Sequence, residues 1–124
     1  MEKKKILIIE DDSILQKALR EFLEAEGFET LNALNGEDGA RIGKSKKPDL
    51  ILLDIIMPMM PGTKVAEELL NHKATKDIPI IFVTAIVKRG ELGPRDDKIG
   101  GRYFIFKPVK LDELLIEIEN RLGS

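Results

Sequence analysis

Polar side chains able to do chemistry follow four short apolar runs in this sequence. They are the acidic run Glu10-Asp11-Asp12, the carboxylate of Asp54, the hydroxyl of Thr84 and the amine of Lys107. For Asp54 taken alone, a solvated loop start is the simpler interpretation. The joint pattern is different, because carboxylates that converge on one crevice repel one another by about 1–4 kcal/mol per pair at surface-like dielectric. The pattern therefore predicts a cation among these carboxylates.

Magnesium is the ion that this set of side chains favours, with Mn²⁺ as a substitute. Mg²⁺ takes oxygen ligands and is satisfied by one or two carboxylates, with waters or phosphate oxygens in its remaining positions. The sequence has no cysteine, and its one histidine, His72, lies far from the acidic run. That donor set argues against a zinc or copper site.

An aspartate beside such an ion can act as a nucleophile towards phosphorus. Attack by the Asp54 carboxylate would form an acyl phosphate, while the metal and the ammonium group of Lys107 neutralise charge on the phosphoryl oxygens. The hydroxyl of Thr84 offers a neutral donor to a further oxygen. These residues supply a nucleophile, metal ligands and partners for an oxyanion.

Two periodicities alternate along the chain and indicate which elements position these residues. Continuous apolar runs, typical of strands buried on both faces, predict strands at Ile6–Ile9, Phe28–Leu31, Leu50–Leu53, Ile80–Val83 and Tyr103–Phe106. Apolar residues at helical spacing predict helices from an N-cap at Ser13 to a stop at Gly27, from Asn35 or Gly36 to about Lys46, from Thr63 to about His72, and over Lys110–Leu122. The glycine- and proline-rich segment Lys88–Gly101 allows only a short helix near Arg95–Ile99.

Five strands alternating with five helices indicate the α/β class, with a parallel sheet covered on both faces by right-handed crossovers. In such sheets, ligands bind outside the carboxyl ends of the strands, where the strand order reverses. The chemically active side chains stand at those ends. With 124 residues and no linker or repeat, the chain is expected to form a single domain, 1–124.

Composition narrows the classes of function. The 20 basic and 22 acidic residues give a formal net charge of -2, which offers no general field for nucleic acid or for a membrane surface. No apolar stretch is long enough for a signal peptide or a membrane span. The lack of cysteine fits a reducing compartment. We expect a cytoplasmic protein with no direct contact with nucleic acid and no membrane insertion.

Four stretches of the sequence resemble, in order and in spacing, the receiver domain of two-component response regulators. They are the run from Ile6 to Asp12, the run Asp49-Leu50-Ile51-Leu52-Leu53-Asp54-Ile55-Ile56-Met57-Pro58, the triplet Val83-Thr84-Ala85 and the triplet Phe106-Lys107-Pro108. No single one is specific, but the four in register cover essentially the whole chain. The resemblance implies a flavodoxin-like (βα)5 doubly wound fold with strand order 2-1-3-4-5.

The resemblance also implies a function in phosphorelay signal transduction. Asp54 would take a phosphoryl group from a phosphohistidine on a sensor histidine kinase or a histidine phosphotransfer protein. Asp11 and Asp54 would ligate Mg²⁺ through their side chains, Glu10 through a water, and Ile56 through its backbone carbonyl. The chain would not be an enzyme in its own right, but a phosphoacceptor that assists its own phosphorylation and dephosphorylation.

A conformational switch is the second implication. Thr84, followed by Ala85, would move towards the phosphoryl group, and Phe104 would turn inward behind it. The Lys107–Pro108 peptide bond would be cis, as it usually is in the family. The switched form would bind a downstream effector or a second copy of the chain. From its residue type alone, Gly62 is expected to provide a backbone angle that other residues resist.

Three departures from the family pattern lead to further expectations. Phe104 stands where tyrosine is frequent, and strand alternation puts the neighbouring Tyr103 on the opposite face. The glycine- and proline-rich segment before the fifth strand would make the fourth helix short or irregular. This weakens the expectation that the chain dimerises through the family's usual face, which includes that helix. Ile56 and Ile86, two residues beyond Asp54 and Thr84, would flank the phosphate with apolar surface. We therefore predict slow self-dephosphorylation, because these side chains would obstruct an incoming water.

Three alternatives stay open from the sequence. A Mg²⁺-dependent aspartate-nucleophile phosphohydrolase of the haloacid dehalogenase type would use the same residues, but it needs a second aspartate where Ile56 stands. A receiver-like interaction module would not be phosphorylated. A flavodoxin-like cofactor binder would need a phosphate-cradling loop where Glu10-Asp11-Asp12 stands. Asp12 suits a helix start better than a metal site. The chain is expected to be either a stand-alone receiver or a fragment of a longer regulator.

Overall fold

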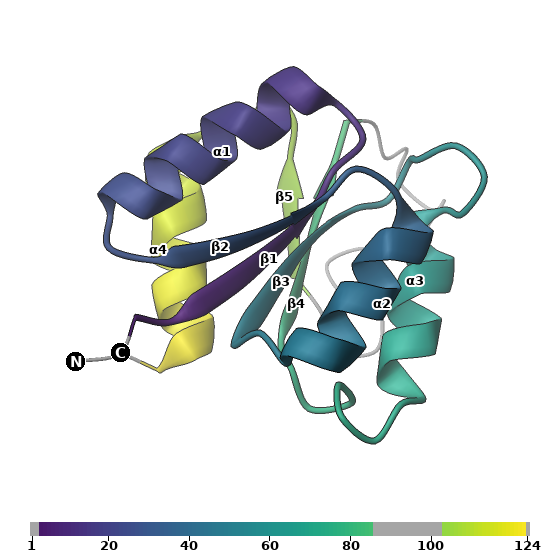
Figure 1. The fold of residues 1–124 in the computed structure, drawn as a ribbon. Helices are drawn as coiled ribbons and strands as arrows, with labels where there is room; N and C mark the ends of the chain where they lie inside the picture. Colours follow the sequence, from purple (N-terminus) through teal and green to yellow (C-terminus); the bar gives the residue numbers. More distant parts are fainter. Residues whose placement is uncertain (1–2, 86–102, 124) are drawn as a thin grey trace.

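Five parallel strands form the centre of the protein, in the order β2-β1-β3-β4-β5 (Figure 1). The structure is a computed structural model that describes residues 3–85 and 103–123. The strands are β1 (Lys5–Ile9), β2 (Glu29–Ala33), β3 (Leu50–Asp54), β4 (Ile80–Thr84) and β5 (Tyr103–Phe106). The described helices are α1 (Ser13–Ala25), α2 (Gly36–Lys46), α3 (Gly62–Leu70) and α4 (Leu111–Leu122). The predicted α/β class and strand order are confirmed, while the short helix predicted at Arg95–Ile99 lies outside the described residues.

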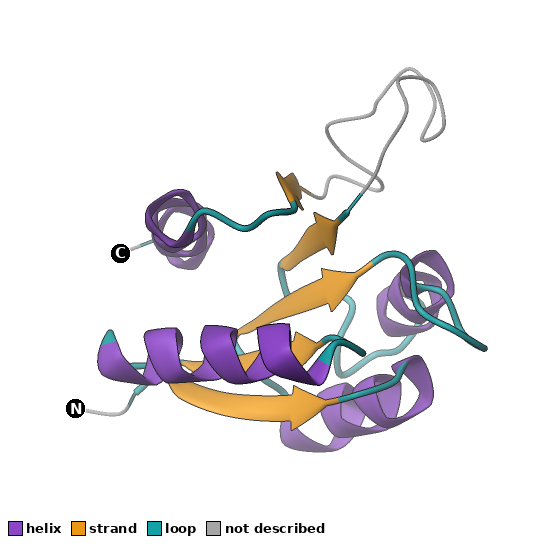
Figure 2. Cartoon of the chain, turned by 90° about the horizontal axis from the view of Figure 1, so that it is seen from above, coloured by secondary structure: helices purple, strands orange, loops and turns teal. Residues whose placement is uncertain are grey.

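The helices cover both faces of the sheet, with α1 and α4 on one side and α2 and α3 on the other (Figures 1 and 2). This arrangement explains why the strands read as continuous apolar runs. Leu7 and Leu53 pack into the core under α2 and α3, whereas their neighbours Ile8 and Leu52 pack into the core under α1 and α4. Because successive side chains of a strand point to opposite faces, a strand buried on both faces must be apolar throughout.

Helix α1 begins one residue away from the predicted cap. The sequence predicts an N-cap at Ser13, but Asp12 is the N-cap, and its Oδ1 accepts hydrogen bonds from the backbone N–H groups of Ile14 (3.0 Å) and Leu15 (3.2 Å). A carboxylate satisfies these unpaired donors and also complements the positive end of the helix dipole. The predicted stop at Gly27 is confirmed, since its φ of +98° lies in the left-handed region.

Strand β2 lies later in the chain than predicted. The apolar run suggested Phe28–Leu31, but the parallel register pairs Lys5 with Glu29 and Ile9 with Ala33. Phe28 precedes the strand and packs against the core beneath α1 and α4. Pairing with β1, rather than local hydrophobicity, sets the bounds of β2. The residue types of this segment alone do not reveal that pairing.

Helix α2 forms despite its glycines. The predicted start at Asn35 or Gly36 is confirmed: Asn35 is the N-cap, and its Oδ1 accepts from the N–H of Asp38 at 2.8 Å. Gly39 and Gly43 face inward, and a Cβ on Gly39 would lie 2.5 Å from Ile9 Cδ1. These glycines therefore lower the intrinsic helix propensity but allow α2 to pack closely on the sheet.

Candidate functional site

The predicted chemical groups lie together at the carboxyl edge of the sheet. Glu10 and Asp11 directly follow β1, Asp54 ends β3, Thr84 ends β4 and Lys107 directly follows β5. The parallel register aligns these ends. β1 pairs with β2 on one side and with β3 on the other, so the crevice between β1 and β3 is the point where strand order reverses.

Lys107 joins two buried carboxylates at this edge. Its Nζ lies 3.2 Å from Glu10 Oε1 and 3.3 Å from Asp54 Oδ2. Glu10 and Asp54 are each 2% exposed, whereas the lysine side chain is 20% exposed. Removal of the lysine would leave two buried acids without their cationic partner, which is a costly arrangement in a protein interior.

Three carboxylates at the site are close enough to share one cation. Glu10, Asp11 and Asp54 each offer an oxygen, and these oxygens lie within 4.8 Å of one another. Asp11 is exposed at the mouth, while the other two are buried. An all-oxygen donor set with one solvent-facing member fits a hard divalent ion that retains waters. Asp12 is directed to α1 as its N-cap and is not a member of this group.

Burial makes these acids reluctant to ionise in the absence of a cation. Burial raises the pKa of Glu10 to about 7, and repulsion from Asp54 contributes, although the backbone N–H of Asp12 and the charge of Lys107 oppose the shift. Burial also raises the pKa of Asp54, against the hydrogen bond with Glu10 and the charge of Lys107. For Lys107, burial lowers the pKa, but the carboxylates of Glu10 and Asp54 outweigh it and the net shift is upward. The site therefore favours the neutral forms of Glu10 and Asp54 more than water does, and a bound cation would favour their ionised forms.

The loop after β3 is built around Asp54. The backbone N–H of Ile56 donates to Asp54 Oδ1 at 3.2 Å, while Oδ2 faces Lys107. The side chain of Ile56 is 56% exposed. The two oxygens of the nucleophile candidate therefore have distinct environments, one bonded to the main chain and one facing the Lys107 ammonium group.

Gly62 is required at this loop for a different reason from the one predicted. Its φ is not positive, so the expected unusual backbone angle is wrong. A Cβ at this position would overlap the carbonyl oxygen of Asp54 and lie 2.8 Å from Ile55 Cα. The glycine permits the first turn of α3 to pack directly on the end of β3, where its N–H donates to the Ile55 carbonyl at 2.8 Å.

The switch candidates lie on β4 and β5. Thr84 is fully buried, and its Oγ1 has no hydrogen-bond partner among the described residues. The N–H of Lys107 donates to the Thr84 carbonyl at 2.7 Å, and the Lys107–Pro108 bond is cis, as expected. Phe104 is half-buried and stacks on Phe82, with ring centroids 5.3 Å apart. Ala85 is exposed directly after Thr84.

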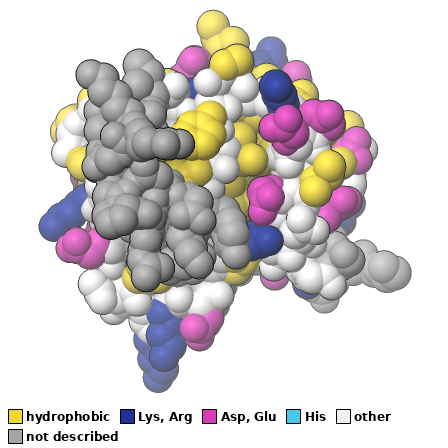
Figure 3. Space-filling view, turned by 180° about the vertical axis from the view of Figure 1, so that it is seen from behind, with side chains coloured by type: hydrophobic (Ala, Val, Ile, Leu, Met, Phe, Trp, Pro, Cys, Tyr) yellow, Lys and Arg dark blue, Asp and Glu magenta, His cyan; other side chains and the backbone are white. Residues whose placement is uncertain are grey.

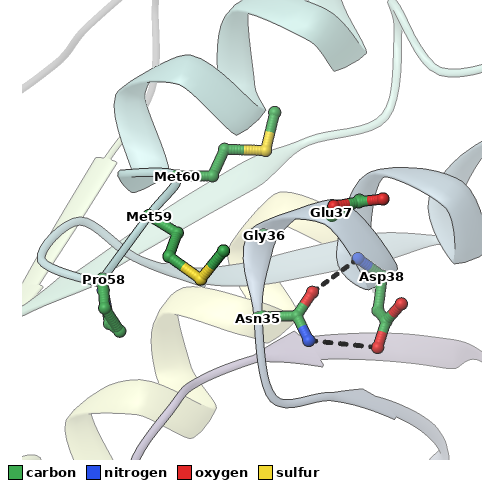
Figure 4. Close-up of a pocket in the computed structure, with 7 residues that line it drawn as sticks. All are labelled: Asn35, Gly36, Glu37, Asp38, Pro58, Met59 and Met60. Atoms are coloured by element: carbon green, nitrogen blue, oxygen red, sulfur yellow. Dashed lines mark hydrogen bonds between the residues drawn. The ribbon is translucent and has the colours of Figure 1, made fainter.

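A pocket of about 380 Å³ lies between the start of α2 and the loop after β3 (Figure 4). Its lining residues are Asn35, Gly36, Glu37, Asp38, Pro58, Met59 and Met60. The polar atoms of Asn35 cap α2 by bonding to Asp38. None of the acidic cluster lines this pocket, so the cluster is a separate site.

Comparison with known proteins shows the family. A model of the family described as response regulator receiver domain matches residues 6–119. Polar-differentiation response regulators DivK from Brucella anthropi and Brucella abortus are each 32% identical over 121 residues, covering 98% of this chain and 98% of theirs. The chain therefore belongs to the response regulator receiver domain family.

Solved structures agree with this assignment. A putative response regulator from Chloroflexus aurantiacus superposes with a TM-score of 0.86 at 25% identity, over 99% of this chain and 100% of that one. A CheY-like receiver domain from Methanospirillum hungatei gives 0.85 at 29% identity, over 98% and 95%. The receiver domain of sensor histidine kinase PA1611 from Pseudomonas aeruginosa, with a magnesium ion in its active-site cleft, shares the fold at 0.84 and 24% identity, over 99% and 100%.

Family membership makes this a signalling domain of a two-component system rather than a metabolic enzyme. Members of the family interact with histidine kinases or phosphotransfer proteins and with effectors. No helix in the described ranges is long and apolar enough to cross a membrane. On the described part of the face in Figure 3, several acidic side chains gather on the right of the view, and basic side chains lie nearby and at the bottom. The predicted cytoplasmic location stays a prediction.

Proposed function

We propose that this receiver domain accepts a phosphoryl group on Asp54 from the phosphohistidine of a sensor histidine kinase or a histidine phosphotransfer protein, in a Mg²⁺-dependent reaction. The observation that carries the proposal is the surroundings of the Asp54 carboxylate. Two further carboxylates lie within 4.8 Å, and an ammonium group lies 3.3 Å from Oδ2. This arrangement at the strand-order reversal supplies both a nucleophile and the charges that phosphoryl transfer requires.

The residues that would hold the ion are Glu10, Asp11 and Asp54, together with the backbone carbonyl of Ile56. The raised pKa values of Glu10 and Asp54 are a second argument, because a bound cation would favour the ionised forms that burial disfavours. When bound, Mg²⁺ supplies positive charge that neutralises the carboxylates and the phosphoryl oxygens. The magnesium-bearing PA1611 receiver domain, which shares this fold, supports the choice of ion, and Mn²⁺ meets the same ligand requirements.

The chain's own residues account for the transfer step. A carboxylate oxygen of Asp54 forms the new bond to phosphorus, while the bond from phosphorus to the donor nitrogen breaks and its electron pair stays on the imidazole. Lys107 Nζ lies 3.3 Å from Asp54 Oδ2. From this position it can donate to a phosphoryl oxygen as negative charge develops there. The Ile56 N–H holds Oδ1 and so limits rotation of the carboxylate.

Thr84 and Phe104 are the residues through which the signal would pass. The buried hydroxyl of Thr84, which bonds to none of the described residues, gains a partner when a phosphoryl oxygen is within its reach. Movement of Thr84 changes the space beside Phe104, because the two belong to adjacent strands. This coupling would bias the surface offered to an effector or to a second copy of the chain.

An apolar rim of exposed side chains that follow the ends of three strands supports a protein as the phosphodonor. The side chains of Ile14, Leu34 and Ile56 are 81%, 49% and 56% exposed, and all three follow the carboxyl ends of strands. Exposed apolar residues around a charged centre are typical of a protein interface. A partner that carries phosphohistidine could therefore dock over the crevice.

The experiment is incubation with a small-molecule phosphodonor and Mg²⁺, followed by intact mass measurement. We expect one phosphoryl adduct on the wild type and none on Asp54→Asn or when EDTA is present. Asp12→Asn is the matched control, because it removes a neighbouring carboxylate but retains an N-cap. An adduct on both wild type and Asp54→Asn would show that a residue other than Asp54 is phosphorylated. The absence of any adduct would favour an interaction module that is not phosphorylated, and continuous turnover of the donor would favour a phosphohydrolase.

A further inference from the structure

Gln16 links three elements behind the acidic cluster. It is only 8% exposed, and its Nε2 donates to the carbonyl oxygen of Ala33 at 2.7 Å and to that of Glu10 at 3.3 Å. Leu19 and Leu23 share its buried face of α1. An amide at such a position is unfavourable unless it is hydrogen-bonded, and here it bonds to the ends of β2 and β1.

The backbone around Glu10 is held from two sides. On one side, the Glu10 carboxylate accepts the N–H of Asp12 at 3.1 Å and faces Lys107. On the other side, the Glu10 carbonyl accepts the Gln16 amide, while the Glu10 N–H donates to Ala33 at 3.1 Å. The peptide between Glu10 and Asp11 is thus fixed in orientation. Its own carbonyl accepts from Gln16, and the peptide groups on either side of it are also hydrogen-bonded.

The exposed Asp11 depends on this peptide for its direction. It is the one member of the acidic cluster that is not buried, so surrounding side chains restrain it least. A small rotation of the peptide before Asp11 would swing its carboxylate away from the other two. Outer contacts that orient a metal ligand change metal affinity even though they never touch the ion.

We propose that Gln16 is a positioning residue that fixes the Glu10–Asp11 peptide and thereby aims the Asp11 carboxylate at the cation site. This inference rests on the proposed function, since the ion is part of it. A purely structural Gln16 would instead close the ends of β1 and β2, and its loss would lower stability without a specific effect on metal binding.

Two substitutions separate the hydrogen bonds from the volume of the side chain. Gln16→Met keeps the length but removes both donors, and Gln16→Asn keeps the amide but shortens its reach. We expect each to raise the Kd for Mg²⁺ by about tenfold, as for loss of an outer contact to a metal site. Calorimetric titration with Mg²⁺ alone measures this. In the metal-free protein, the NMR amide signals of Asp11 and Asp12 should also shift.

Thr75→Val is the matched control for stability. Thr75 is 1% exposed, and its Oγ1 donates to the Leu69 carbonyl at 2.6 Å before β4, at the opposite edge of the sheet. This variant also loses a buried bond from a side chain to a backbone carbonyl, but we expect its Kd for Mg²⁺ to stay within about twofold of the wild type because the sites are distant. Metal affinity and the melting temperature of metal-free protein are compared across all variants.

The outcomes distinguish this inference from the proposed function. A wild type that binds Mg²⁺ alongside Gln16 variants of equal affinity would overturn the inference alone. The same holds if Thr75→Val weakens binding as much as Gln16→Met, because the effect would then follow general stability. A wild type that binds no Mg²⁺ would overturn the proposed function and the inference with it. If Gln16→Met does not fold, Gln16→Asn decides the question.

Discussion

The two edges of the sheet place the same residue types in opposite circumstances. At the amino edge, Asp49 Oδ2 accepts the backbone N–H of Lys5 at 2.7 Å, and Thr75 Oγ1 donates to a backbone carbonyl at 2.6 Å. At the carboxyl edge, Asp54 faces other charged side chains, and Thr84 Oγ1 bonds to none of the described residues. The first aspartate and threonine bond to the main chain within the fold, and we propose that the second pair is available to a ligand.

This contrast shows how a structural polar group differs from a functional one. A buried hydroxyl or carboxylate that the main chain satisfies stabilises the native state and has no capacity left for a ligand. A carboxylate crowded against like charges is unfavourable until a ligand arrives. The unfavourable edge is therefore the edge that should respond to metal, to pH and to phosphoryl donors, and substitutions there should affect activity more than stability.

The largest effect should come from loss of the lysine. Lys107→Met removes the ammonium group that contacts both Glu10 and Asp54. We expect the rate of Asp54 phosphorylation from a small-molecule donor to fall by about 100-fold, the typical effect of removing one preorganised charge partner of a transition state. The time course of the intact-mass adduct at saturating Mg²⁺ measures this rate.

Lys44→Met provides the comparison for that experiment. Lys44 pairs with Glu68 at 3.2 Å between α2 and α3, with side chains that are 30% and 42% exposed. A pair of this kind contributes at most about 1 kcal/mol to stability and lies outside the acidic cluster. Equal phosphorylation rates in Lys107→Met and wild type, or an equal loss in Lys44→Met, would contradict the role of Lys107.

The next effect concerns pH and the metal-free protein. Folding raises the pKa of Glu10 from 4.5 to about 7, so between these values the native state binds more protons than the unfolded state. Stability contributed by protonated Glu10 is present below the unfolded pKa and is lost as the pH rises through the folded one. Without metal, the free energy of unfolding should therefore fall by about 2 kcal/mol from about pH 5 to about pH 8.

Glu10→Gln should remove most of this pH dependence, because the amide has no proton to lose. Asp54 contributes in the same direction, since burial raises its pKa too. Urea unfolding in EDTA, followed by circular dichroism, measures the slope, and the exposed Glu21→Gln should retain the wild-type slope. Mg²⁺ should stabilise the wild type more at the higher pH, because it binds the ionised acids. A stability that rises over this range without metal would contradict the assignment.

Much of the fold was predictable because each strand is buried on both faces. Short continuous apolar runs such as Leu50–Leu53 are typical of strands buried on both faces. Their alternation with helical patterns indicates a parallel sheet. The errors occur where pairing overrides local pattern. The extent of β2 follows its register with β1, and the cap of α1 is the residue whose side chain reaches the helix N–H groups, Asp12 rather than Ser13.

The side chains of the candidate site were predictable from the sequence, but the residues that hold them in place were not. Asp54 and Thr84 end their strands, and Glu10 and Lys107 directly follow theirs, so topology alone brings the four together. The requirement for Gly62 comes from close packing on Asp54, which depends on how the loop returns to β3. Gln16 was missed, although a signal existed: it stands three and seven residues before Leu19 and Leu23 on an otherwise apolar stripe. Ile86, the second predicted barrier to water, lies outside the described residues.

The smallest effect tests whether the exposed apolar rim controls the lifetime of the phosphoryl group. Ile56 is 56% exposed, and its N–H donates to Asp54 Oδ1, so the residue lies next to the carboxylate that we propose is phosphorylated. Ile56→Gln should shorten the lifetime of phosphorylated protein by about threefold to tenfold, because an amide can orient a water that an alkyl group excludes. Decay of the intact-mass adduct after donor removal measures this. Met59→Gln, at a fully exposed position in the same loop, should leave the decay unchanged. Equal decay in Ile56→Gln and wild type would show that Ile56 does not limit access of water, and equally faster decay in both variants would assign the effect to the loop rather than to this side chain.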